Sequence, residues 1–397
     1  MRVLFCTTAG AGHFAPLVPF ARACVAAGFE VRVAAPHSFG AAVQAAGLEH
    51  SPFDDAPPAE IGAVFSQLHL GTVAEANRRV LREVFAGIDA RAALPALRAT
   101  VETWRPDVIV SEPAEFAGAV LAEEHDLPHA LVNIGLDAFS DHVLDEVDDA
   151  LHALGCASGS GRLRRSPRLS LLPSRFDEVR GPGEVHRFGD ESAAVPASTT
   201  PAHWWEATDL TAPLVYVSFG SVAGGLGFYP GFYREVLDEL CTVPARVLMT
   251  LGAGIDPGAL GELAPNVHVE SWWPQQEVLS EAAVVIGHSG FGTLLATLAH
   301  GRPQVAIPLF SADQYVNAAR VSSSGVGLSL SPGDPEALRS ADLVPGGPDV
   351  SGLAVATMLA LTDPAMRAAA AQVADEMARL APVSAAAEVL RRVTGEA

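Results

Sequence analysis

Short apolar segments that alternate with amphipathic ones constrain this chain more than any other feature. In the first half, buried strands are expected at Arg2–Thr7, Glu30–Ala35, Asp107–Val110 and His129–Asn133. Amphipathic segments separate them, one of them running from about 114 to 125. Strands joined through helices pair in parallel, because the helix returns the chain to the starting edge of the sheet. The first half therefore predicts an α/β domain with a doubly wound sheet.

The second half repeats this alternation with a different sequence. Strands are expected at Leu214–Ser218, Arg246–Leu251, Val267–Glu270, Val284–Gly287 and Gln304–Ile307. Helices are expected at 230–241, 291–300, 313–323 and 364–380. A chain of 397 residues has room for two such domains. We therefore expect two Rossmann-like α/β domains, residues 1–200 and 201–380, which face each other across a cleft and bind ligands at the carboxyl ends of their strands.

Three segments stand outside this alternation. Gly155–Arg168, rich in Gly, Ser and Arg, predicts a surface loop, and Val195–Pro213 predicts the linker between the domains. The acidic run Asp145–Asp149 lies in an apparent helix away from any phosphate-binding loop. It therefore indicates a solvated helix face rather than a metal-binding motif.

The composition excludes several classes of partner and cofactor. The formal net charge is -21, whereas nucleic acids and anionic membranes need clustered cations, so neither is expected as a partner. All 25 basic residues are arginine, which excludes the lysine of a Walker A site or of a pyridoxal phosphate Schiff base. The four cysteines form no C-x-x-C pair, so reduced thiols in a cytoplasm are expected. The apolar N-terminus has only the length of a strand, which predicts neither a signal peptide nor a membrane anchor.

A glycine-rich turn with a histidine, Gly10-Ala-Gly12-His13, follows the first strand. It formally matches the dinucleotide-binding fingerprint, which also needs an acidic residue at the end of the second strand. That strand ends Ala34-Ala35-Pro36-His37, so a nicotinamide or flavin cofactor is not favoured. His13 is placed at the ligand-binding edge of the sheet, where either a structural or a catalytic role is open.

A carboxylate follows another strand of the same domain, in Ser111-Glu112-Pro113. Because the carboxyl ends of parallel strands share one edge, Glu112 and His13 are expected on the same face. A histidine paired with a carboxylate is a standard general base. A helix cap is the alternative role for Glu112, and Glu115 competes for either role.

The third group of motifs lies in the second half: Trp272-Trp273-Pro274-Gln275, His288-Ser-Gly290-Phe-Gly292-Thr293 and Asp313-Gln314. A helix that begins near Gly290 presents backbone N–H groups and a partial positive charge, so it can hold phosphate without lysine. Core packing of the tryptophans and a capping role for Asp313 are the alternatives.

These motifs resemble the nucleotide-sugar signature of family 1 glycosyltransferases, which have the two-domain GT-B fold. The strand and turn Val215-Tyr-Val-Ser-Phe-Gly-Ser221 and the opening Gly12-His13-x-x-Pro16 are similar to the same family. The resemblance spans nearly the whole chain. It is greatest to the actinomycete branch that glycosylates natural products of the polyketide, enediyne and macrolide types.

The resemblance implies a role for each site residue. His13 would deprotonate an acceptor hydroxyl, and Glu112 would orient it. The implied donor-binding residues are Gly12, Ser221, Trp272, Trp273, Gln275, His288, Gly290, Gly292, Thr293, Asp313 and Gln314. The reaction would be an inverting transfer to an apolar aglycone without a metal or a cofactor. The last segment, 381–397, is expected to cross back to the N-terminal domain, and a monomer or a homodimer is compatible with the sequence.

Two departures from plant members of the family concern the donor. Gly292 stands where plant members have Asn, so phosphate contacts would come from the backbone. Ala296 stands where they have a Glu that binds both ribose hydroxyls, which favours a dTDP-sugar over a UDP-sugar. A nucleotide-sugar epimerase of the same fold and a catalytically silent binding protein remain alternatives.

Overall fold

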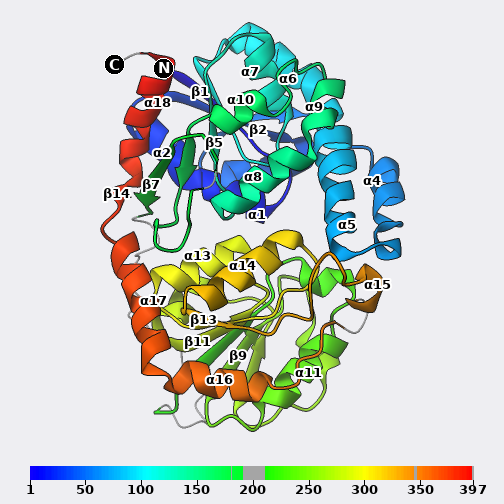
Figure 1. Ribbon diagram of the computed structural model, residues 1–397, viewed down its shortest axis with the longest axis vertical. Helices are drawn as coiled ribbons and strands as arrows, with labels where there is room; N and C mark the ends of the chain where they lie inside the picture. The colour runs from blue at the N-terminus through cyan, green and yellow to red at the C-terminus, as the bar shows by residue number, and fades with distance from the viewer. Residues whose placement is uncertain (180, 191–210, 344–346, 396–397) are drawn as a thin grey trace. The chain divides into compact units, whose positions relative to one another are not determined.

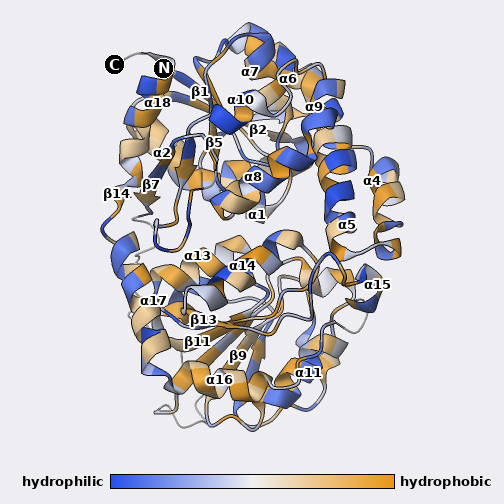
Figure 2. Cartoon of the chain, viewed as in Figure 1, coloured by the Kyte–Doolittle hydropathy of each residue, from blue (hydrophilic) through white to orange (hydrophobic). Residues whose placement is uncertain are grey.

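The computed structural model describes residues 1–179, 181–190, 211–343 and 347–395, which form two compact units (Figure 1). Unit 1 comprises Met1–Leu68, Glu75–Ser192 and Arg379–Ala397, and unit 2 comprises His69–Ala74 and Ala193–Ala378. Apolar residues dominate the strands, whereas many helices are polar on one side (Figure 2). Apolar strands and one-sided helices are typical of buried sheets that amphipathic helices cover.

Unit 1 contains an eight-stranded parallel sheet with the order β14-β7-β6-β5-β4-β1-β2-β3. The strands are β1 (Arg2–Cys6), β2 (Glu30–Pro36), β3 (Glu49–Phe53), β4 (Val108–Ser111), β5 (His129–Val132), β6 (Arg168–Ser170), β7 (Val185–Gly189) and β14 (Ala381–Pro382). The helices include α1 (Ala11–Phe14), α2 (Val18–Ala26), α3 (Gly40–Ala45), α4 (Pro58–Phe65), α5 (Val73–Arg79), α6 (Ala90–Trp104), α7 (Ala117–Glu124), α8 (Asp137–Glu146), α9 (Asp148–Ala153), α10 (Gly161–Arg165) and α18 (Ala386–Thr394). The α/β class predicted for the first half is confirmed.

Unit 2 contains a six-stranded parallel sheet with the order β10-β9-β8-β11-β12-β13. The strands are β8 (Leu214–Ser218), β9 (Arg246–Thr250), β10 (Val267–Glu270), β11 (Ala282–Gly287), β12 (Gln304–Ala306) and β13 (Gly327–Ser329). The helices are α11 (Gly231–Leu240), α12 (Gln275–Glu281), α13 (Phe291–Ala299), α14 (Ala312–Ser323), α15 (Ser340–Leu343), α16 (Leu353–Thr362) and α17 (Pro364–Met377). The five strands predicted in this half are present.

Both faces of the unit 2 sheet are buried, as its sequence pattern requires. Along β8, Val215 and Val217 belong to one apolar cluster, whereas Leu214 and Tyr216 belong to another. Successive side chains of a strand point to opposite faces, so each face has its own core. A continuous apolar run rather than strict alternation is expected of such a strand.

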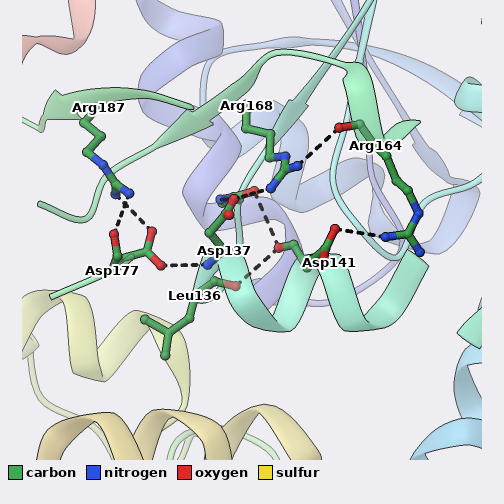
Figure 3. A network of polar contacts seen from close by, with 9 residues as sticks. Leu136, Asp137, Asp141, Arg164, Arg168, Asp177 and Arg187 are labelled. Atoms are coloured by element: carbon green, nitrogen blue, oxygen red, sulfur yellow. Dashed lines mark hydrogen bonds and ion pairs between the residues drawn. The ribbon is translucent and has the colours of Figure 1, made fainter. Parts of the chain in front are cut away.

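The surface loop predicted at Gly155–Arg168 is wrong. This segment contains α10 and leads into β6, and Arg168 is 1% exposed. A buried ion pair joins Arg168 Nη1 to Asp137 Oδ1 at 2.5 Å, and Asp177 Oδ1 accepts a hydrogen bond from the Asp137 N–H at 2.8 Å (Figure 3). Arg187 also binds Asp177, at 3.0 Å. Paired charges can be buried in a core, which composition alone does not reveal.

The acidic run Asp145–Asp149 spans the end of α8 and the start of α9, and its aspartates are exposed or half-exposed, as predicted for a solvated helix face. Asp148 accepts hydrogen bonds from the N–H and the hydroxyl of Ser160, both at 2.7 Å, and Asp145 pairs with Arg164. The run therefore fastens α10 to its neighbours. The linker predicted at Val195–Pro213 lies largely outside the described residues.

The C-terminal segment belongs to unit 1 together with the N-terminus. β14 pairs with β7 at Ala381 and Phe188, and α18 follows. Arg391 lies over the ring of Phe29 at 4.9 Å. Within the described ranges, no helix combines the length and the apolar character needed to cross a membrane.

Candidate functional site

The strand order of unit 1 reverses between β1 and β4, which are parallel neighbours. Cys6 and Ser111 are partners at the carboxyl ends of these strands. Loops that leave two such strands diverge to opposite faces and leave a crevice, which is where open α/β sheets bind ligands. The His13 turn follows β1 and Glu112 follows β4, so the fold brings the two predicted residues to this crevice.

His13 and Glu112 form a hydrogen-bonded pair. Nδ1 of His13 lies 3.1 Å from Oε1 of Glu112, with the Glu112 side chain buried and the His13 side chain 25% exposed. If Nδ1 carries the proton that faces Glu112, the lone pair that can accept another proton is on Nε2. This arrangement has the geometry of a general base and its orienting carboxylate.

Hydrogen bonds within unit 1 hold Glu112 in place. Its Oε1 accepts from the N–H of Thr8 at 3.3 Å and from the Thr8 hydroxyl at 3.2 Å, and its Oε2 accepts from the N–H of Ala114 at 2.6 Å. Burial alone would raise the pKa of Glu112, but the charge and hydrogen bond of His13 and the backbone donors lower it below its usual value. The carboxylate therefore stays ionised beside His13.

Glu115 does not contact His13 but caps the start of α7. Its carboxylate accepts from the Ser111 hydroxyl at 3.2 Å and from the Gly118 N–H at 3.1 Å. Burial raises the pKa of Glu115 to about 7. Of the two carboxylates in this turn, Glu112 pairs with His13 and Glu115 has the capping role.

The donor role implied for Gly12 stays a prediction. Gly12 lies in α1, is exposed, and a Cβ built on it would meet nothing within 4 Å. Phe85, which was not predicted as a site residue, contacts His13, with 5.4 Å between the centroids of the two rings. Phe85 belongs to no recognisable motif.

Unit 2 has the same reversal of strand order, here between β8 and β11. Ser218 and Gly287 are partners at their carboxyl ends, and His288 follows directly. A Cβ on Gly220 would lie 3.0 Å from Nε2 of His288, and one on Gly290 would lie 2.4 Å from it. The two glycines therefore leave the space that the imidazole occupies.

His288 is a neutral imidazole at physiological pH. Burial lowers its pKa to about 4, and a backbone hydrogen bond involving Ser218 opposes this shift. A neutral ring has a single N–H, and the Ser218 backbone already accepts it. Its place at the carboxyl end of β11 therefore suits a donor to an anionic ligand only if this N–H turns from Ser218 to the ligand.

The N-terminus of α13 is formed by the predicted glycine-rich turn. Gly290 is the N-cap, and a Cβ on Gly292 would meet nothing within 4 Å. Thr293 in the first turn accepts a hydrogen bond from the side chain of Gln275 at 3.2 Å. The structure thus brings Gln275 and Thr293 together beside the exposed N–H groups of a helix, which favour an anion.

The two tryptophans of the motif differ in environment. The Trp272 side chain is among the exposed large apolar residues, with 63% of its surface exposed. Trp273 packs against the apolar cluster that contains Ala296. Core packing therefore explains Trp273, whereas Trp272 presents an aromatic face to solvent. Ser221 is also exposed, after the turn at Gly220.

Asp313 and Gln314 lie in the first turn of α14. Ser311 is the N-cap of this helix, and its hydroxyl bonds to Asp313. Gln314 is buried, and its Oε1 accepts from the N–H groups of Leu309 at 2.8 Å and Phe310 at 3.2 Å. Only the amide NH₂ of Gln314 thus remains to donate to a ligand.

Two family models match the chain and together cover most of it. The N-terminal domain of erythromycin biosynthesis protein CIII-like proteins matches residues 22–155, and the C-terminal domain matches residues 234–393. The elloramycin glycosyltransferase ElmGT of Streptomyces olivaceus is 31% identical, with 98% of this chain and 97% of that protein covered. The chain therefore belongs to the family of erythromycin biosynthesis protein CIII-like proteins. It is a glycosyltransferase of the kind found in antibiotic biosynthesis.

Two further relatives agree with this assignment. The TDP-daunosamine transferase DnrS of Streptomyces peucetius is 29% identical to the present glycosyltransferase, with 99% of this chain and 97% of that protein covered. The crystal structure of the glycosyltransferase SnogD from Streptomyces nogalater superposes with a TM-score of 0.70 at 27% identity, covering 100% and 99% of the two chains. The GT-B fold expected from the motifs is confirmed.

A strained residue lies next to the N-cap in unit 2 of this glycosyltransferase. Ser289 has a φ of 61°, in the left-handed region that non-glycine residues rarely adopt. The side chain of Asn317, itself buried, donates to the carbonyl of Ser289 at 2.8 Å. Asn317 therefore clamps the backbone turn that aims the first N–H groups of α13.

We expect Asn317→Ala to weaken the binding of dTDP about tenfold, because it removes a buried hydrogen bond that holds the left-handed turn. The double variant Asn317→Ala, Ser289→Gly should recover most of the affinity for dTDP, since glycine adopts a positive φ without strain. Calorimetric titration of dTDP into both variants measures this. If the double variant binds as weakly as Asn317→Ala, the clamp does not act through the turn.

Proposed function

We propose that this glycosyltransferase moves a sugar, in particular a deoxysugar, from a dTDP-linked donor to a hydroxyl of an apolar natural-product aglycone, with inversion at the anomeric carbon. The observation that carries the proposal is the hydrogen-bonded pair of His13 and Glu112 at the switch point of the unit 1 sheet, the place where its strand order reverses. The glycine-rich turn at the switch point of the other supports it. We infer that unit 1 binds the acceptor and unit 2 binds the nucleotide sugar.

In the proposed reaction, the acceptor oxygen attacks the anomeric carbon while Nε2 of His13 takes its proton. The bond from that carbon to the diphosphate oxygen breaks, and dTDP leaves with the bonding electrons. Glu112 stabilises the imidazolium that forms, because it stays ionised and contacts Nδ1. A single displacement of this kind inverts the configuration. No metal ion takes part.

The diphosphate gains negative charge as it leaves, and the α13 turn suits that charge. We propose that the N–H groups near Gly290 and Gly292, the Thr293 hydroxyl and the His288 imidazole hold it. Donors that are already in place for a developing charge are usually the largest electrostatic contribution to catalysis. Ser221 would add a hydroxyl from the neighbouring turn.

The remaining motif residues would bind the base, the ribose and the sugar. The exposed ring of Trp272 offers a stacking face for thymine, with Trp273 and Gln275 beside it. The Asp313 carboxylate would accept hydrogen bonds from sugar hydroxyls, and the Gln314 amide NH₂ would donate hydrogen bonds to them. Gln314 would thereby link the sugar to the backbone that its Oε1 already holds.

A preference for dTDP over UDP follows from Ala296. A uridine 2′-hydroxyl in this site would lose its water and find no carboxylate, because residue 296 is an alanine packed into the apolar cluster with Trp273. The name of the relative DnrS, a TDP-daunosamine transferase, supports the same donor class.

We expect calorimetric titration to give a severalfold lower dissociation constant for dTDP than for UDP. Thymidine and uridine without phosphates serve as controls, since they report the nucleoside contribution alone. Equal affinities, or tighter binding of UDP, would remove the support for a dTDP donor while leaving sugar transfer in place.

A further inference from the structure

A cavity within unit 1, with a volume of about 190 Å³, is lined by residues that contact His13 or Glu112. Its walls include Thr8 and Ala114, whose N–H groups hold Glu112. They also include Phe85, whose ring packs against His13. The cavity is therefore separated from the proposed base and its carboxylate by no more than their contact residues. The volume is below the roughly 300–1,000 Å³ of sites for drug-sized ligands, so it suits one end of an acceptor.

A wide helical segment places a carboxylate, Asp89, in the wall of this cavity. The π-helix η4 (Val80–Asp89) leads directly into α6. A Cβ on Gly87 would lie 2.9 Å from the carbonyl oxygen of Arg82, five residues earlier, so this geometry depends on glycine. Phe85 and Asp89 lie one turn apart and both line the cavity. π-Helical segments occur often at functional sites.

Asp89 differs from the other carboxylates at this cavity. Asp54 lies 3.8 Å from His37, Asp55 binds the N–H of Ser38, and Glu115 caps α7. In the described part of the chain, the carboxylate of Asp89 makes no hydrogen bond and no ion pair.

The environment of Asp89 disfavours its charge without neutralising it. Burial raises its pKa to about 6, the charge of His13 lowers the pKa and that of Glu112 raises it. The group is still mostly ionised at neutral pH. An ionised, partly buried carboxylate without a donor is costly unless a ligand supplies one.

The rest of the wall is largely apolar, with Phe53, Ile61, Phe85, Ala90, Ala93 and Phe116. Among the described residues that line the cavity there is no arginine and no histidine. The cavity wall itself thus supplies no counter-charge to Asp89, and aromatic rings next to a carboxylate favour a cationic ligand.

We propose that Asp89 is a specificity-determining residue that binds a basic nitrogen on the acceptor. The inference rests on the proposed function, because it takes this cavity as one end of the acceptor site. Asp89 holds the protonated nitrogen while an acceptor hydroxyl faces His13. Acceptors with a neutral or anionic group at that end bind more weakly.

Two isosteric probes test this with the full chain and without a nucleotide sugar: para-(dimethylaminomethyl)phenol, which is cationic at neutral pH, and para-isobutylphenol. Calorimetric titration of the wild type should show that the amine binds at least about tenfold more tightly than para-isobutylphenol. A charge-assisted hydrogen bond contributes a difference of this size. Equal affinities, or no binding of the amine up to its solubility limit, would overturn the proposal without any variant.

The variant Asp89→Asn should abolish the preference for the amine and leave the affinity for para-isobutylphenol unchanged. It should unfold at the same or a higher temperature, because it removes a charge that burial disfavours. The control Glu83→Gln makes the same charge change on the exposed side of η4, where Glu83 pairs with Arg79, and should keep the preference. A preference retained in Asp89→Asn, or lost equally in Glu83→Gln, would contradict the proposal.

Sugar transfer separates this inference from the function on which it rests. If the amine binds through Asp89 but no sugar is transferred to any acceptor, the proposed function fails and the nitrogen site stands. If sugar is transferred but the two probes bind equally, the nitrogen site fails and the proposed function stands.

Discussion

His13→Ala lowers the rate of sugar transfer by roughly 10²- to 10⁴-fold, the usual contribution of a general base. The acceptor oxygen then attacks while it still carries its proton, and the bond to the anomeric carbon forms against a developing positive charge. The affinity for dTDP stays unchanged, because the proposed donor residues belong to unit 2. Initial rates at saturating donor and calorimetric titration of dTDP measure the two quantities.

The matched control for His13→Ala is His152→Ala, which removes an exposed imidazole from the same unit. His152 pairs with Asp148 on the surface, 3.5 Å away, and its loss should leave the rate unchanged. Glu112→Gln should slow transfer but less than His13→Ala, since the base remains while its orienting charge is lost. Full turnover in His13→Ala would show that another group takes the proton.

Asp137→Asn lowers the stability of unit 1 by about 3–5 kcal/mol, because it leaves the buried charge of Arg168 without its partner. Arg168 and Asp137 are 1% and 0% exposed, and the pair fixes the start of α8 against β6. In a domain of this size the change lowers the midpoint of thermal unfolding by about 6 °C or more. Differential scanning calorimetry of the full chain measures it.

An exposed ion pair in the same unit provides the comparison. Arg98 binds Glu124 with two hydrogen bonds, at 2.9 and 2.8 Å, on the surface. Glu124→Gln should cost less than about 1 kcal/mol, as exposed pairs do. The double variant Asp137→Asn, Arg168→Gln should recover part of the loss, because no unpaired charge remains. If the two single variants Asp137→Asn and Glu124→Gln unfold at the same midpoint temperature, the buried pair does not stabilise the unit more than the exposed pair does.

The strands flanking both switch points could be predicted because they are continuous apolar runs, as at Val284–Gly287, and turns with glycine bound them. Parallel topology then placed His13 and Glu112 on one face, but only the structure decided that Glu112 rather than Glu115 pairs with His13. β6 and α10 could not be predicted, since Arg168 resembles a surface residue until its partner Asp137 is known. Asp89 was missed for another reason: the role proposed for it depends on a widened helix and a cavity, and neither of these produces a recognisable spacing in the sequence. His69–Ala74 was likewise placed in unit 2 only by the structure, through bonds such as the one from the Val73 N–H to the Leu338 carbonyl at 2.9 Å.

The configuration of the transferred sugar tests the central claim most directly, since it reports both the transfer and its single-displacement course. Proton NMR of the product formed from a dTDP-linked sugar of known anomeric configuration measures it through the coupling constant of the anomeric proton. We predict a glycoside with the opposite configuration to the donor, because a single displacement places the acceptor oxygen on the face opposite the leaving diphosphate. A product with retained configuration would contradict the account.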